Sequence, residues 1–172
     1  MPFDLRRSLI GVLALATLVS CGDPTRDAII ESLGEEAPGV PVGPLHRPGQ
    51  PCNVCHDGEV AREFSVAGTV YWAFDSKKPA PGAHVDLTDA DGDQQVAYAN
   101  CAGNFFLFPE DTHVDFPFWV KVSGGGVEIA MDSPVNGQGS CAACHKKTLS
   151  PRSTGRVYLY ENPPGPPPED CQ

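Results

Sequence analysis

The chain has 172 residues, enough for one hydrophobic core with appended segments. Hydrophobic residues make up 41% and charged residues 20%, while 18 glycines and 18 prolines favour turns, short strands and linkers over long helices. The formal net charge is −10 at pH 7, which argues against binding to nucleic acids or, through charge, to anionic lipid headgroups. We therefore expect no nucleic-acid partner.

Residues 1–20 have the pattern of an export signal. Two arginines precede an apolar run over 9–19 that is too short to span a bilayer comfortably. The run ends at 18–21 in a sequence similar to a bacterial lipobox, in which the cysteine is acylated; an ordinary signal peptide with a chance cysteine is the alternative. We expect a lipoprotein anchored through Cys21, in the outer membrane and facing the periplasm or the exterior.

The sequence of the segment after the signal predicts little regular secondary structure. A short helix is possible over 27–33, and 37–44 is rich in proline and glycine. Such composition is typical of stiff, extended linkers. We expect residues 21–51 to form a tether between the anchor and a folded domain over 52–160.

The pattern Cys-x-x-Cys-His occurs twice, at 52–56 and 141–145. Two thiols at this spacing can each form a thioether with one vinyl group on a single porphyrin edge, and the adjacent histidine then binds the iron. In an exported chain, two copies predict a dihaem c-type cytochrome with two covalently bound haem c groups. The expected thioether residues are Cys52, Cys55, Cys141 and Cys144, and the expected proximal ligands are His56 and His145.

The cysteines also allow other interpretations. Two Cys-x-x-Cys units can form a four-thiolate zinc site, or two separate redox disulfides. Zinc does not require a histidine after both second cysteines, and thioredoxin-like disulfides need a βαβ context that is absent from the pattern, so haem is favoured. Cys101 and Cys171 remain; in an exported chain they can form a disulfide, the alternatives being free thiols or an intermolecular bond from Cys171.

The sequence leaves the sixth ligands of the two irons open. His46 lies in a proline-stiffened segment before the first motif and is the best histidine candidate for either haem. Met131 ends a strand ten residues before Cys141 and is a candidate for the second haem, although a core methionine is the simpler interpretation. Methionine ligation would raise that haem's potential relative to two histidines. His84, on an outward strand face, and His113, in a polar loop, are weaker candidates.

Short runs that alternate apolar and polar residues predict strands between residues 64 and 131. The clearest run is 83–88, followed by a turn at 89–93 in which Asp-Gly supplies a positive φ, and a return strand at 95–99. Further strands are expected at 64–74, 103–108, 116–122 and 127–131. We expect an all-β sandwich with its core at about 64–131, followed by a proline-rich tail at 161–172.

Three blocks within 66–122 resemble the carboxypeptidase regulatory-like (transthyretin-like) domain. They are Gly-Thr-Val at 68–70, Pro-Gly-Ala-His-Val-Asp-Leu at 81–87 and Asn-Cys-Ala-Gly-Asn-Phe at 100–105. The family usually has Thr-Asp before the third block, where this chain has Ala-Asn. The resemblance implies a Greek-key sandwich of the Ig/transthyretin-like class, flanked here by two c-haem attachment loops. Such domains are scaffolds, so the resemblance concerns fold alone.

Each haem motif also precedes a Gly-x-Val-Tyr sequence, at 68–71 and at 155–158. If these two strands are neighbours in one sheet, the two haems would lie near each other at one end of the sandwich.

Two haems, a lipid anchor and no further catalytic constellation indicate an electron carrier that exchanges electrons with other redox proteins of the cell envelope, and not an enzyme. A first alternative is a haem enzyme or ligand sensor that acts on peroxide or a similar small molecule at one five-coordinate haem. A second is a structural or docking cytochrome subunit of a larger assembly, with His84 or His113 donated between subunits.

Overall fold

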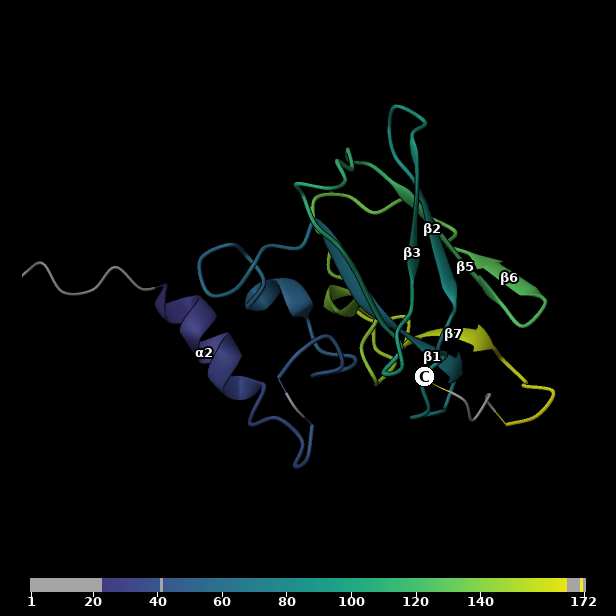
Figure 1. Ribbon diagram of the computed structural model, residues 1–172, viewed down its shortest axis with the longest axis horizontal. Helices are drawn as coiled ribbons and strands as arrows, with labels where there is room; N and C mark the ends of the chain where they lie inside the picture. Colours follow the sequence, from purple (N-terminus) through teal and green to yellow (C-terminus); the bar gives the residue numbers. More distant parts are fainter. Residues whose placement is uncertain (1–22, 41, 167–170, 172) are drawn as a thin grey trace, which may run out of the picture. The chain divides into compact units, whose positions relative to one another are not determined.

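The computed structural model describes residues 23–40, 42–166 and 171 (Figure 1). The chain divides into two compact units, with the boundary between Ser32 and Leu33. In the first unit, α2 (Pro24–Ser32) begins after Asp23, whose Oδ1 accepts hydrogen bonds from the amides of the second and third helical residues. The predicted export signal and Cys21 lie outside the described residues.

The second unit is mostly β-structure, arranged in two sheets (Figure 1). The sheets have the strand orders β4-β1-β7 and β3-β2-β5-β6, and only the β1–β7 pair is parallel among the described pairs. The predominance of strands and the two sheets agree with the expected β-sandwich. The strands are β1 (Val66–Ala73), β2 (His84–Thr88), β3 (Gln94–Tyr98), β4 (Asn104–Leu107), β5 (Trp119–Gly124), β6 (Val127–Ala130) and β7 (Val157–Tyr160).

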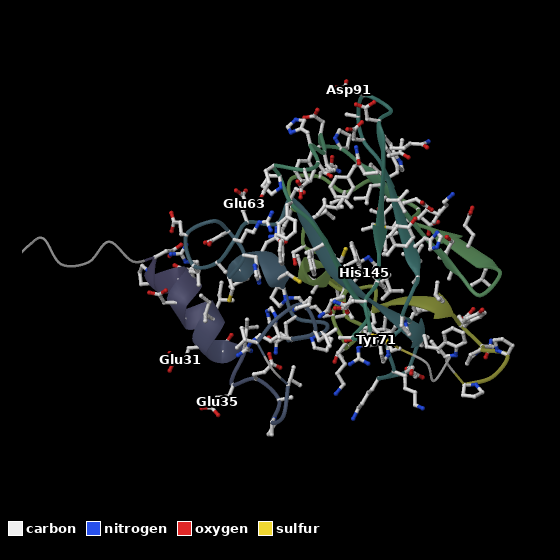
Figure 2. The ribbon with its side chains drawn as sticks, viewed as in Figure 1. Glu31, Glu35, Glu63, Tyr71, Asp91 and His145 are labelled. Atoms are coloured by element: carbon white, nitrogen blue, oxygen red, sulfur yellow. A yellow bond between two sulfur atoms is a disulfide. The ribbon has the colours of Figure 1, made fainter. Side chains whose placement is uncertain are left out.

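The core lies between the two sheets and follows from the alternation along the strands. In β2, Val85 and Leu87 are buried, whereas His84, Asp86 and Thr88, which alternate with them, are not. The turn after β2 closes as predicted, because Asp89 Oδ1 accepts the amides of Asp91 and Asp93; Figure 2 shows Asp91 at the tip of this hairpin. The largest fully buried side chains come from both sheets and their connections: Phe118, Leu87, Val66, Val70 and Val85.

The core extends beyond the predicted limits of 64–131, because β7 contributes buried Leu159 and Tyr160. The two Gly-x-Val-Tyr sequences are indeed neighbours: β1 and β7 pair in parallel, with Val70 opposite Val157. The segment before the second Cys-x-x-Cys-His motif also runs along β1, where the amide of Ala67 donates to Gly139 O at 2.9 Å. The two strands are therefore neighbours in one sheet, which is the arrangement required for the two Cys-x-x-Cys-His motifs to lie near each other.

Residues 33–51 differ from the extended tether that their composition predicts, since they belong to the same compact unit as the sheets. The side chain of Asn104 donates to Pro44 O and His46 O, and the amide of Gly49 donates to Thr69 Oγ1 at 2.7 Å. Buried polar groups on β1 and β4 thus hold this segment against the three-stranded sheet.

A disulfide joins Cys101 to Cys171 across 70 residues, with the Cα atoms 5.3 Å apart. Because a cross-link of this span restricts the unfolded chain, replacing both cysteines with serine is expected to lower the free energy of unfolding by about 2–4 kcal/mol. Urea denaturation of the exported protein without reductant measures this change. A difference below about 1 kcal/mol would contradict the stabilising role of the bond.

Candidate functional site

The two Cys-x-x-Cys-His motifs fold into the same local structure. Each forms a single 3₁₀ turn, η1 (Cys52–Val54) and η2 (Cys141–Ala143), entered from an extended residue. The amides of His56 and His145 donate to the carbonyl of the first cysteine of their own motif, at 2.9 and 2.8 Å. This tight turn keeps the two thiols and the following imidazole of each motif close together.

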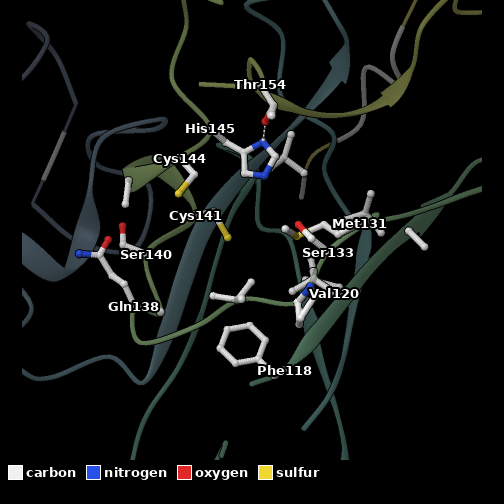
Figure 3. Close-up of a pocket in the computed structure, with 18 of the residues that line it drawn as sticks. Phe118, Val120, Met131, Ser133, Gln138, Ser140, Cys141, Cys144, His145 and Thr154 are labelled. Carbon is white, nitrogen blue, oxygen red and sulfur yellow. Dashed lines mark hydrogen bonds between the residues drawn. The ribbon is translucent and has the colours of Figure 1, made fainter. Parts of the chain in front are cut away.

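Both motif histidines are oriented through Nδ1. Nδ1 of His56 lies 2.8 Å from Arg62 O, and Nδ1 of His145 lies 2.9 Å from Gly155 O. A carbonyl oxygen can only accept, so Nδ1 carries a proton, and in the neutral ring Nε2 then keeps a free lone pair. Thr154 Oγ1 makes a second contact with Nδ1 of His145 at 3.1 Å (Figure 3). Metal-binding histidines are held in this way, with the other ring nitrogen donating to a fixed acceptor.

The first motif lines a cavity of about 470 Å³ with an aromatic wall. The ring of His56 stacks on Phe64, with centroids 3.9 Å apart, and Phe64 stacks on Phe106 at 4.8 Å. Phe108 completes the group, at 5.4 Å from Phe64. One face of the His56 imidazole therefore lies against an apolar, aromatic surface.

His46 lines the same cavity as His56, and their ring centroids are 5.7 Å apart. Nδ1 of His46 contacts Gly43 O, so this ring also has its proton on Nδ1 and a free lone pair on Nε2. The backbone of His46 is held by Asn104, whose side chain donates to His46 O at 2.9 Å. The structure thus brings together two histidines that lie ten residues apart in the chain.

The second motif lines a larger cavity, of about 610 Å³. Cys141, His145 and Met131 surround it, and Phe118 forms part of its apolar wall (Figure 3). Phe105 of β4 lines both this cavity and the first one. The two cavities thus approach each other at the three-stranded sheet, against whose central strand β1 both η1 and η2 pack.

Within the part of the chain that the structure describes, the four cysteines of the two motifs are unpaired, in contrast to the bonded Cys101 and Cys171. Burial raises the pKa of the Cys52 thiol to about 11 and that of the Cys141 thiol to about 12. Charge repulsion from Cys52 also raises the pKa of Cys141, so these first cysteines of the two motifs lie within electrostatic range of each other. Both thiols are neutral at neutral pH and sit in apolar surroundings.

The weaker histidine candidates lie elsewhere, and neither lines the two cavities. His84 is exposed on the outer face of β2, where its ring meets Tyr98 edge-on with centroids 4.7 Å apart. His113 is exposed, and its Nε2 lies 3.1 Å from Asp115 Oδ1.

Several residues that shape the two sites were not identified from the sequence. They include the cavity phenylalanines, the carbonyl acceptors of the imidazoles and Asn104. Alternating phenylalanines at 106 and 108 were a usable signal, since both fall on one strand face opposite Phe105. No local signal marks the carbonyl acceptors, because any residue can supply one.

Comparison with known proteins finds no matching family, no similar curated protein and no similar solved structure. Within residues 23–40, 42–166 and 171, no cluster of three or more His, Cys, Asp or Glu side chains is arranged to hold a metal ion by itself. None of the helices in that part of the chain combines the length and apolar character needed to cross a bilayer.

Proposed function

We propose that the protein is an exported, lipid-anchored dihaem cytochrome c that relays electrons in the bacterial cell envelope or at the cell surface. The observation that carries the proposal is the pair of like turns. Each turn presents two unpaired thiols and a histidine with its proton held on Nδ1, at the edge of an apolar cavity. The cavities, about 470 and 610 Å³, fall within the range of cofactor pockets, roughly 300–1,000 Å³.

The residues of each site fit a covalently bound haem. Cys52 and Cys55 would hold the first haem, and the equivalent pair, Cys141 and Cys144, would hold the second. His56 and His145 would bind the irons through Nε2. A bound haem supplies one-electron chemistry, and the protein tunes it through ligands and burial.

The remaining residues of the sites orient the ligands and exclude water. The carbonyls of Arg62 and Gly155 fix the imidazole rings, and Phe64 covers one face of the His56 ring. A neutral thioether suits the buried positions of Cys52 and Cys141 better than a charged thiolate does.

We infer further that residues 1–20 are an export signal and that Cys21 carries the lipid, which places the protein at the outer membrane, facing periplasm or exterior. Its partners would be other redox proteins of the envelope. The sandwich itself is inferred to be a Greek key of the transthyretin-like class. In support, β4 lies beside β1 after an intervening β2–β3 hairpin in the other sheet.

The proposal is tested by the intact mass of the protein after export in a host with the c-haem maturation system. The wild type is expected to carry two haems and an acylated N-terminus. C52A/C55A and C141A/C144A should each lose one haem, because each pair holds a different one. The matched control, C101A/C171A, removes the other two cysteines of the folded domain and should keep both haems.

The same measurements can also contradict the proposed function. A protein with no haem, or with stoichiometric zinc in its place, would overturn the proposal. A five-coordinate, high-spin iron that turns over peroxide would show that the protein is a haem enzyme and not an electron carrier.

A further inference from the structure

We propose that the two haems have unlike axial ligands: His46 with His56 on the first iron, and Met131 with His145 on the second. This inference rests on the proposed function and adds the sixth ligands, which set the potentials of the two sites.

The first cavity contains a second imidazole at a suitable separation. The ring centroids of His46 and His56 are 5.7 Å apart. Two imidazoles that bind one metal ion from opposite sides have ring centres roughly 6 Å apart, because each nitrogen–metal bond is about 2 Å long. No methionine is among the described residues that line this cavity.

His46 is also held as a ligand is held. Its Nδ1 contacts Gly43 O, which leaves Nε2 free, as in His56 and His145. His113 shows the opposite arrangement, since its Nε2 is occupied by Asp115. Among the five histidines, the three with Nδ1 on a backbone carbonyl are the three that line the cavities.

The backbone around His46 supports the same assignment. Arg47 has a φ of 49°, a left-handed conformation that is uncommon for a residue other than glycine. Its guanidinium donates one hydrogen bond to Gly34 O at 2.8 Å and another to Gln50 Oε1 at 3.0 Å. Local strain of this kind persists where the surrounding structure fixes it, which is typical of functional sites.

The second cavity offers a different donor. His145 is the only histidine among the residues that line it, and Met131 lies on its wall (Figure 3). The amide of Met131 donates to Val120 O at 3.0 Å, which fixes its backbone at the end of β6. A thioether is a known partner of histidine on haem iron, and it raises the potential relative to two histidines. The second haem should therefore be reduced before the first.

The test uses the purified dihaem protein and single variants, with low-temperature EPR, magnetic circular dichroism and a redox titration. In the wild type we expect two low-spin irons, one with bis-histidine and one with histidine–methionine signals, and two separate potentials. H46A should convert half of the iron to the high-spin state, and added imidazole should restore it. H84A and H113A are the matched histidine controls and should leave both irons unchanged.

Met131 is tested in the same way. M131A should convert the other half of the iron to the high-spin state. M131H should give two bis-histidine irons and lower the potential of the second site towards that of the first. If the mass shows two haems but H46A or M131A leaves both irons low-spin with unchanged spectra, the ligand assignment is wrong while the proposed function stands. If the mass shows no haem, the proposed function itself has failed.

Discussion

Replacing Asn104 with alanine is expected to lower the free energy of unfolding by about 2–4 kcal/mol and to loosen the segment that carries His46. The side chain is buried, at 7% exposure, and all of its bonds are long-range. Its Nδ2 donates to His46 O at 2.9 Å and to Pro44 O at 3.2 Å, and its Oδ1 accepts from Thr69 Oγ1 at 2.7 Å. Alanine would remove the side-chain partner of His46 O and the acceptor of the buried Thr69 hydroxyl, which costs more than the bonds themselves contribute, whereas Pro44 O keeps its bond from Asn100 Nδ2.

The variant has a second, spectroscopic consequence if His46 binds the first iron. Part of the first haem should become high-spin, while the second haem stays unchanged. Urea denaturation and EPR on the exported protein measure both effects. The matched control is Asn136→Ala, because Asn136 is exposed and its side chain bonds only to nearby Pro134 O; its stability should change by less than about 0.5 kcal/mol. Equal behaviour of the two variants would show that Asn104 does not hold the segment.

Replacing Phe118 with alanine is expected to lower the free energy of unfolding by about 3–5 kcal/mol. Phe118 is 1% exposed and belongs to the core cluster between the sheets. Its amide and carbonyl both bond to Val135, so the backbone cannot easily move in to fill the space that the ring leaves. The loss of the ring therefore creates a cavity in addition to removing apolar contacts.

Phe118 also lines the second cavity, so the same variant should perturb the second haem and spare the first. Thermal or urea unfolding gives the stability, and the visible spectrum reports the haem sites. Phe116→Ala is the matched control, because that ring is 44% exposed and should cost about 1 kcal/mol. A Phe118 variant as stable as the control would contradict the assignment of Phe118 to the core.

Much of the β-structure could be predicted from local pattern. The alternation at 83–88 places Val85 and Leu87 inside, and the Asp-Gly turn closes the hairpin that follows. The pairing of β1 with β7 could also be inferred, because the same four-residue pattern lies within β1 and across the start of β7. Strand limits differ by at most three residues, since the ends of a strand depend on its neighbours more than on its own sequence.

The placement of the thiols beside their histidines follows from local sequence, because a single turn of chain presents the Cys-x-x-Cys-His spacing. The buried face of β2 also follows from its alternation. Three features depend on tertiary packing: residues 33–51 fold back on the sheet, His46 lines one cavity together with His56, and Met131 lines the other together with His145. Some of these contacts are made by backbone carbonyls and by buried side-chain amides such as that of Asn104. The partners of such groups depend on how distant segments pack, so they leave no periodic pattern in the sequence.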